Sequence, residues 1–232
     1  MRVNKRSESG FTLVEIAIVL VIIGLLLGGI LKGQEMITQA KIKNVIADMT
    51  GVSAAMYGYQ DRYKALPGDD KNAGARWTSA VNNASGNGDG VITGVYTVAA
   101  SGTTANTAME AGFFWGHLRL AGFISGTDTA EPFNAVSGMM GVETGDGGGT
   151  GSIVGVLSDG AATPTKFSAL MLCSANLPDK IAISVDAQTD DGVGNTGTVR
   201  GQKQTQPNPT VAATADVYTE DGVSTYLVCR LM

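Results

Sequence analysis

The sequence predicts an α+β protein: one long amino-terminal helix, half membrane-spanning and half amphipathic, packed against a mainly antiparallel β head with one or two short extra helices. Residues 11–31 form an apolar run, and apolar residues then recur at helical spacing until Pro67-Gly68 ends the pattern. The remainder is rich in glycine (32 of 232 residues in the whole chain), with short apolar stretches that are typical of turns and strands.

The apolar run from Phe11 to Leu31 has the length of a membrane helix, for which roughly 20 residues are enough. Lys32 and Glu35 follow it, rather than the small residues at which a secretory signal is removed. On the residues alone, the run is therefore a retained membrane helix. The basic residues ahead of it place its amino end on the cytoplasmic side.

One acid, Glu15, lies inside this run. A carboxylate at the centre of a bilayer costs about 2.5–3.5 kcal/mol on insertion scales, so such a group usually has a partner and a purpose. The residues Gly10-Phe11-Thr12-Leu13-Val14-Glu15 resemble the signature of the type IV pilin and type II secretion pseudopilin superfamily, Gly-Phe-Thr-Leu-x-Glu before an apolar helix. The resemblance covers Gly10 to Leu31.

The resemblance implies that a prepilin peptidase cleaves between Gly10 and Phe11, removes residues 1–10 as a leader and leaves Phe11 as a methylated amino terminus. It also implies that Glu15 of an incoming subunit pairs with the Phe11 ammonium of an assembled neighbour. In a medium of low dielectric constant such a pair is strong and sets the axial register. The alternative is a simple single-span membrane anchor in which Glu15 lies near the membrane interface and has no partner. That alternative leaves the adjoining Gly-Phe-Thr-Leu unexplained.

The implied partners are the prepilin peptidase, identical or homologous pilin subunits, the membrane and an inner-membrane assembly platform. The implied location is a single-pass inner-membrane precursor with its head in the periplasm, and then a cell-surface or periplasmic filament. Four glycines of the apolar helix form two Gly-x-x-x-Gly pairs, a spacing that lets helices approach closely in lipid: Gly24, Gly28, Gly29 and Gly33.

The helix is expected to continue to residue 64, with the head at 65–232. Its second half has apolar residues on one face: Ile42, Val45, Ile46, Met49, Val52, Met56 and Tyr59. Packing under the chain's own head covers that face in the pilin-like fold that the resemblance implies. In the head, the pattern predicts two helices, at Ala108–Ala121 and Pro178–Gln188. It predicts three strands, at Ile153–Leu157, Thr198–Arg200 and Tyr226–Leu231.

The net charge and the two cysteines bear on possible ligands and on the compartment of the head. The net charge is −5, and an acidic chain with few basic clusters argues against binding a nucleic-acid backbone. Cys173 and Cys229 lie in the part that would face an oxidising space, where an even count favours one disulfide. Two buried thiols are the alternative.

A candidate calcium loop begins at Ser85, where oxygen-bearing side chains alternate with glycines: Ser85, Asn87 and Asp89. Ser85 replaces the usual first aspartate, and Tyr96 stands where the loop needs a glutamate. Asp69 and Asp70 complete a site only if the fold brings them close. Asn-Gly-Asp-Gly is also an ordinary turn sequence, and the turn is the preferred interpretation.

A second acidic group, Asp186, Asp190 and Asp191, has two interpretations: turn chemistry at the end of a helix, which is preferred, or a second calcium or loop-organising site. His117 is the only histidine and is expected to be a packing residue with one hydrogen bond. We therefore expect a structural filament subunit rather than an enzyme. The rival readings are a membrane-tethered, calcium-dependent binding or adhesion module that does not polymerise, and an anchored hydrolase that uses His117 and the second acidic group.

Overall fold

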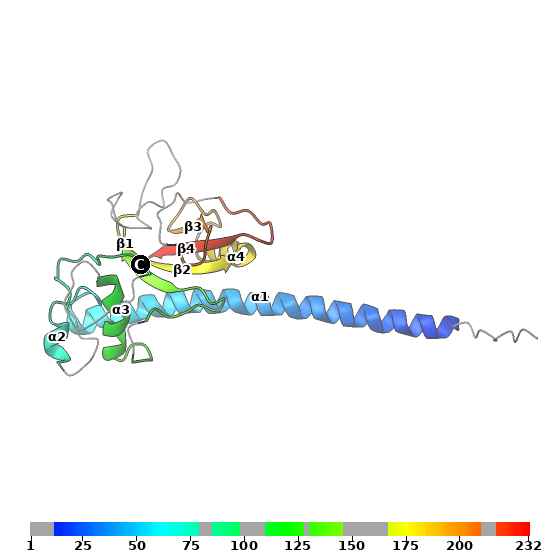
Figure 1. The fold of residues 1–232 in the computed structure, drawn as a ribbon, viewed down its shortest axis with the longest axis horizontal. Coiled ribbons are helices and arrows are strands. Elements are labelled where there is room, and N and C mark those ends of the chain that lie inside the picture. Colours follow the sequence, from blue (N-terminus) through cyan, green and yellow to red (C-terminus); the bar gives the residue numbers. More distant parts are fainter. Residues whose placement is uncertain (1–11, 79–84, 98–109, 128–129, 146–166, 210–216) are drawn as a thin grey trace, which may run out of the picture. The chain divides into compact units, whose positions relative to one another are not determined.

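The computed structural model describes residues 12–78, 85–97, 110–127, 130–145, 167–209 and 217–232. The chain divides into two compact units, Met1–Ala40 and Lys41–Met232. Helix α1 (Leu13–Tyr63) begins in the first unit and ends in the second (Figure 1). The long helix predicted for residues 11–64 is therefore confirmed, with Phe11 itself outside the described residues.

In the first unit, α1 carries a continuous exposed apolar surface. Among the described residues, α1 is the helix that is long and apolar enough to cross a membrane, and none of its most apolar window is buried. The large side chains that remain exposed run from the start of the helix to Ile37: Leu13, Val14, Ile16, Ile18, Val19, Leu20, Val21, Ile22, Ile23, Leu25, Leu26, Leu27, Ile30, Leu31, Met36 and Ile37. No described residue of this unit covers them.

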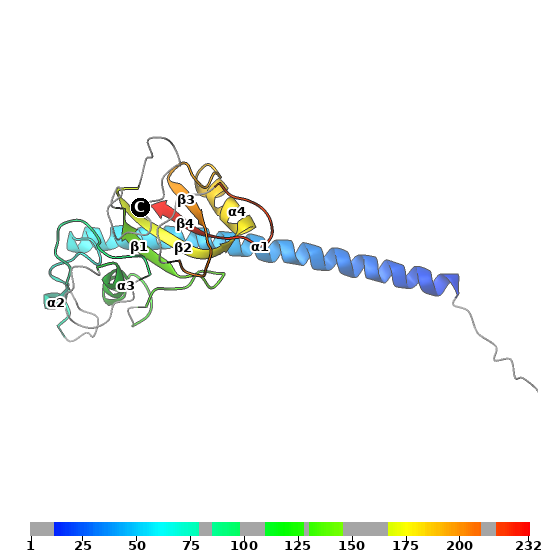
Figure 2. The same cartoon turned by 45° about the horizontal axis from the view of Figure 1, so that its top comes forward.

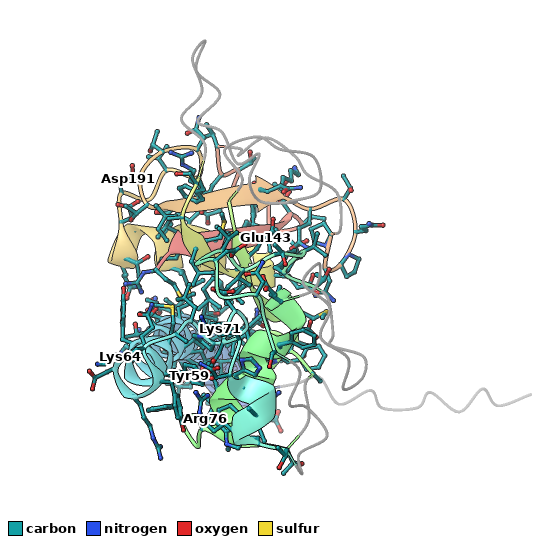
Figure 3. All side chains as sticks on the ribbon, turned by 90° about the vertical axis from the view of Figure 1, so that its left-hand side faces the viewer. Tyr59, Lys64, Lys71, Arg76, Glu143 and Asp191 are labelled. Atoms are coloured by element: carbon teal, nitrogen blue, oxygen red, sulfur yellow. A yellow bond between two sulfur atoms is a disulfide. The ribbon has the colours of Figure 1, made fainter. Side chains whose placement is uncertain are left out.

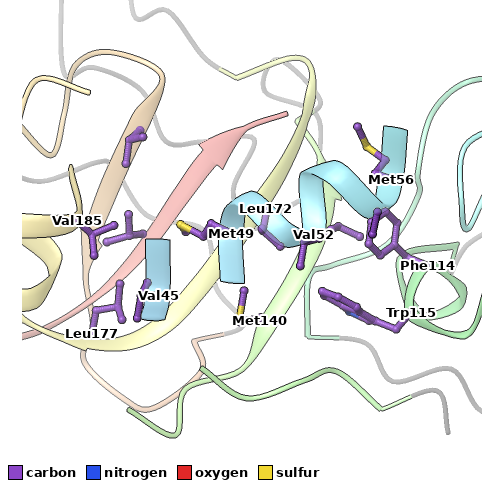
Figure 4. Packing of buried hydrophobic residues seen from close by; sticks show 14 of the residues in the cluster. Val45, Met49, Val52, Met56, Phe114, Trp115, Met140, Leu172, Leu177 and Val185 are labelled. Carbon is purple, nitrogen blue, oxygen red and sulfur yellow. The ribbon is translucent and has the colours of Figure 1, made fainter. Parts of the chain in front are cut away.

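In the second unit, α1 buries a single face. Its buried residues follow the spacing of three and four that keeps side chains on one side of a helix: Ile42, Val45, Met49, Val52, Ala55, Met56 and Tyr59. They pack in one cluster with side chains from the sheet, such as Met140, Leu172 and Leu177, and from the short helices, such as Trp115 and Val185 (Figure 4).

The head contains a four-stranded antiparallel sheet with the strand order β1-β2-β4-β3. Its strands are β1 (Met140–Thr144), β2 (Leu170–Pro178), β3 (Val199–Lys203) and β4 (Thr225–Leu231). The central pair, β2 and β4, is covered by α1 on one face, as two views of the ribbon show (Figures 1 and 2).

Alternation along the central strands divides the core into two clusters. In β4, Tyr226 and Val228 point toward α1, whereas Leu227 and Cys229 belong to a smaller cluster on the opposite face. The pairing of β2 with β4 shifts register between Ser174 and Leu177, where Asn176 has a φ of 58°. This irregularity returns Leu177 to the face that packs on α1.

Three short helices complete the described head: α2 (Ala73–Arg76), α3 (Glu110–Leu120) and α4 (Asp179–Thr189). The last two confirm the helices expected at 108–121 and 178–188, although residues 108 and 109 lie outside the described ranges. The buried faces of α3 and α4 pack in the same cluster as α1.

The predicted strands are confirmed in part. Those expected at 198–200 and 226–231 correspond to β3 and β4, and the one expected at 153–157 lies outside the described residues. Strands β1 and β2 were not predicted. Strand β2 is buried on both faces, so its apolar residues do not alternate with polar ones and give no clear period of two.

Candidate functional site

The amino-terminal site contains Thr12 and Glu15, because the predicted cleavage and methylation positions, Gly10 and Phe11, lie outside the described residues. Glu15 Oε2 accepts hydrogen bonds from the backbone N–H and the hydroxyl of Thr12, both at 2.8 Å. The backbone N–H of Glu15 donates in return to Thr12 Oγ1 at 3.3 Å. This reciprocal arrangement is a capping box, which satisfies amides at the start of α1 that have no partner within the helix.

The capping box leaves half of the carboxylate free. Both bonds use Oε2, and Glu15 Oε1 accepts no hydrogen bond from the described residues. Thr-x-x-Glu, the sequence signal for this cap, is present at residues 12–15. Glu15 therefore has a structural role within its own helix, and one oxygen remains to accept from a second group.

The glycines of the apolar helix lie on open surface. A Cβ built on any of the four would meet nothing within 4 Å: Gly24, Gly28, Gly29 and Gly33. The first unit therefore offers another helix a close approach at these positions, with no side chain of its own in the way.

In the head, Asp69 and Asp70 point to different partners. Asp70 accepts a hydrogen bond from Tyr59 Oη at 2.7 Å and pairs with Arg76 Nη1 at 2.5 Å. Burial opposes its ionisation, but the bonds from Arg76, Tyr59 and the Asn72 amide outweigh burial and lower the pKa of Asp70. Figure 3 shows Tyr59 and Arg76 at this end of the head. Asp70 thus fixes the end of α1 to the following loop.

The carboxylate of Asp69 binds backbone amides of the predicted calcium loop. Its Oδ1 accepts from the amides of Gly88 at 2.6 Å and Asp89 at 3.2 Å, and its Oδ2 accepts from the Gly90 amide at 2.7 Å. A Cβ at Gly86 would collide with the backbone of Gly68 and Asp69, so the loop's close approach requires glycine there.

Glu110, at the start of α3, joins this acidic group. Carboxylate oxygens of Asp69, Asp89 and Glu110 lie within 4.8 Å of one another. Glu110 accepts from the Asn87 amide at 2.9 Å and from Thr93 Oγ1 at 2.9 Å. Burial raises the pKa of Glu110 despite these bonds. No sequence pattern pointed to Glu110, because the contact depends on how the loop folds back onto α3.

The other predicted ligands, Ser85 and Asn87, form hydrogen bonds of their own. Ser85 Oγ accepts from the Gly74 amide at 2.9 Å, and Asn87 Nδ2 donates to Asp89 Oδ2 at 2.8 Å. The structure therefore brings Asp69, Asn87 and Asp89 together and adds Glu110. Asp70 and Ser85 have other partners.

The second acidic group closes a loop at the end of α4. Asp186 accepts from Tyr218 Oη at 2.8 Å and from the Gly192 amide at 3.0 Å, and Asp190 accepts from the Val199 amide at 3.0 Å. Burial is the largest influence on Asp186 and raises its pKa. Asp191, on the surface (Figure 3), accepts from Thr196 Oγ1 at 2.5 Å. These bonds have the form of the turn that was preferred from the sequence, and carboxylate oxygens of the three aspartates lie within 4.8 Å of one another.

His117 is fully buried in α3. Its Nδ1 accepts a hydrogen bond from the Gly68 amide at 2.8 Å, and its ring stacks with those of Tyr59 and Phe113. With Nδ1 engaged and the ring enclosed, the imidazole joins α3 to the Leu66-Pro67-Gly68 segment as a packing residue, as expected.

Cys173 and Cys229 form the predicted disulfide. They are directly opposite each other in the pairing of β2 with β4, and both are fully buried. The bond joins the two central strands and fixes the carboxyl-terminal strand to the sheet.

Comparison with known proteins identifies the amino-terminal segment. Residues 5–31 match the family model described as the prokaryotic N-terminal methylation motif. No curated protein matches the chain, and no solved structure matches it. The motif implies processing by a prepilin peptidase and assembly with other pilin-type subunits, and it fits a membrane-anchored precursor. The chain thus carries the amino-terminal signature of type IV pilin and pseudopilin precursors.

Proposed function

We propose that this protein is a structural subunit of a type IV pilus or a type II secretion pseudopilus. In this proposal it is cleaved after Gly10, methylated at Phe11 and assembled through its amino-terminal helix, with the head carried into the periplasm and then into the filament. An inner-membrane platform drives assembly. The observation that carries the proposal is the uncovered apolar helix from Leu13 to Leu31 with one acid, Glu15, at its start.

Glu15 is suited to join two copies. One oxygen caps its own helix, and the other is left to accept from the Phe11 ammonium of a neighbour. The two tasks do not compete, because a carboxylate has about four lone-pair sites. Within lipid, removal of one member of such a pair costs about 3–5 kcal/mol, because the remaining charge is left without a partner.

Two variants separate capping from pairing. Glu15→Gln keeps a side chain that can complete a capping box but removes the charge, whereas Thr12→Ala removes the cap and keeps the charge. We expect Glu15→Gln to abolish filaments, as seen by electron microscopy of cells that express the full chain with a prepilin peptidase. Thr12→Ala should still assemble.

The matched control is Glu35→Gln, which changes an exposed acid of the same helix that pairs with Lys32. It should assemble normally. Normal filaments from Glu15→Gln would overturn the pairing proposal. Mass spectrometry of the mature amino terminus tests processing separately, since the proposal requires a chain that begins with methylated Phe11.

The second candidate function is a tethered, calcium-dependent binding module that does not polymerise. The grouping of Asp69, Asp89 and Glu110 favours it, and a divalent cation would relieve the repulsion among these carboxylates. The three loop amides already bound to Asp69 favour the turn interpretation instead.

Thermal unfolding of the full chain in detergent, with calcium or with a chelator, distinguishes the two interpretations. A bound cation at one hundred times its dissociation constant stabilises the fold by about 2.7 kcal/mol. The shift should disappear in Asp89→Asn and persist in the exposed control Glu220→Gln. Equal unfolding temperatures with and without calcium would exclude the calcium module.

A further inference from the structure

A groove of about 390 Å³ lies on the head between α1, α3 and residues 123–125 and 132–133. Its floor is the surface of α1 at Ala47, Asp48 and Gly51, and Trp115 and Phe133 contribute walls. Figure 4 labels Val52, Trp115 and Met140, which also line it. All of these residues belong to the second unit.

The groove has the composition of an interface between proteins. Phe133 is 67% exposed, which is unusual for a phenylalanine beside an ordered core. Ala47 is exposed, and a Cβ at Gly51 would meet nothing within 4 Å, so the backbone of another helix can approach the floor.

Charge on α1 indicates what fills the groove. Asp48, in the floor, and Lys43, five residues earlier, are both exposed, and neither forms an ion pair within the described residues. They do not pair within one helix, where residues three or four apart face each other. A second, displaced copy of the same helix can bring the two charges together.

The displacement follows from the proposed function, on which this inference rests. Pairing Glu15 of one copy with Phe11 of the next shifts parallel copies by four residues, about 6 Å along the helix. The same shift places Asp48 of the first copy beside position 44 of the second. Lys43 of the second copy is then only one residue away, about 1.5 Å along the axis, which a flexible lysine side chain spans.

We propose that the groove between α1 and α3 receives α1 of a neighbouring copy, with Lys43 of that copy paired to Asp48 in the groove floor. The contact gives the filament a second register point in the head, in addition to Glu15. It also covers Phe133, which the isolated head leaves exposed.

Charge exchange in the full chain, expressed with the prepilin peptidase, tests the pair. Asp48→Lys places two like charges at the contact and should reduce filament yield tenfold or more. Adding Lys43→Asp restores the opposite charges in reversed order and should recover most of the yield. The control Asp61→Lys changes an exposed acid of α1 outside the groove and should leave filament yield unchanged.

Oxidative cross-linking measures the proximity itself. The double variant Lys43→Cys with Asp48→Cys should give a ladder of disulfide-linked oligomers in membranes, because each copy then bonds to the next. The native cysteines do not interfere, since they are already bonded to each other. Lys43→Cys with Asp61→Cys should give none, since Asp61 lies far beyond the expected shift. The ladder should be lost when Glu15→Gln is added.

The outcomes separate this inference from the proposed function. Filaments that depend on Glu15 but show neither charge rescue nor a ladder would overturn the groove contact and leave the subunit assignment standing. Filaments that ignore Glu15→Gln, or a full chain that never assembles, would overturn both. A ladder that requires Glu15, together with charge rescue, supports both.

Discussion

The two parts of helix α1 have the same backbone structure and opposite side-chain environments. From Leu13 to Ile37 its large apolar residues are exposed all round, whereas from Ile42 to Tyr59 it buries one face in the head. The head part has its packing partner in the same chain. The described residues of the first unit give the other part no such partner, and lipid or another subunit can supply one. Both parts are helical, so what distinguishes them is the surface against which each one packs.

Loss of the Asp70 carboxylate should have the largest effect on the head. Asp70→Asn removes the charge that Arg76 pairs with and weakens the acceptor for Tyr59, which should cost about 3–5 kcal/mol of unfolding free energy because the group is buried. Chemical denaturation of the full chain in detergent measures it. Asp61→Asn, which breaks an exposed pair with Lys64, should cost about 1 kcal/mol or less. Equal losses would mean that the loop does not hold the end of α1.

A matched pair of isoleucines tests the comparison along α1 directly. Ile42 is 1% exposed and Ile22 is 51% exposed. Ile42→Ala should lower the stability of the head by about 2–5 kcal/mol, because it leaves a cavity in the main cluster. Ile22→Ala should leave the unfolding of the head unchanged within about 0.5 kcal/mol. If Ile22→Ala also destabilised the head, the exposed part of the helix would not be independent of it.

The disulfide should contribute a somewhat smaller amount. Replacing both Cys173 and Cys229 by alanine should lower the unfolding free energy by about 2–4 kcal/mol, because the unfolded chain regains the freedom of a long loop. Calorimetry on the double variant measures the loss, and reduced wild-type protein serves as the control. The alternative of two packed thiols predicts no difference between reduced and oxidised protein.

The smallest expected effect is the pH dependence of the stability difference between wild type and Asp70→Asn. Its folded pKa lies below the unfolded value of 3.8, so its stabilisation is present above pH 3.8 and is lost as pH falls through the lower folded pKa. The stability difference between wild type and Asp70→Asn should therefore shrink below pH 3.8 and stay constant between pH 5 and 7. Denaturation curves at several pH values measure this trend. A difference that grew toward acid would contradict the lowered pKa.

Local patterns were sufficient for the features that depend on residues near each other in sequence. The spacing of apolar residues predicted α1 and the face that it buries, Pro-Asp at 178–179 predicted α4, and the cysteine count predicted the disulfide. The residues from Gly10 to Glu15 predicted the methylation motif that residues 5–31 match. In each case the signal lies within a few helical turns, or follows from the compartment that an apolar helix implies.

Tertiary structure alone decided which side chains meet across the head. Two adjacent aspartates were grouped together from the sequence, but successive side chains point in different directions, so Asp69 binds the loop at 88–90 while Asp70 binds Tyr59 and Arg76. Glu110 reaches the same loop from α3, and the groove beside Trp115 requires three separate segments. Such contacts depend on how distant elements pack, and no short-range pattern in the chain encodes that packing.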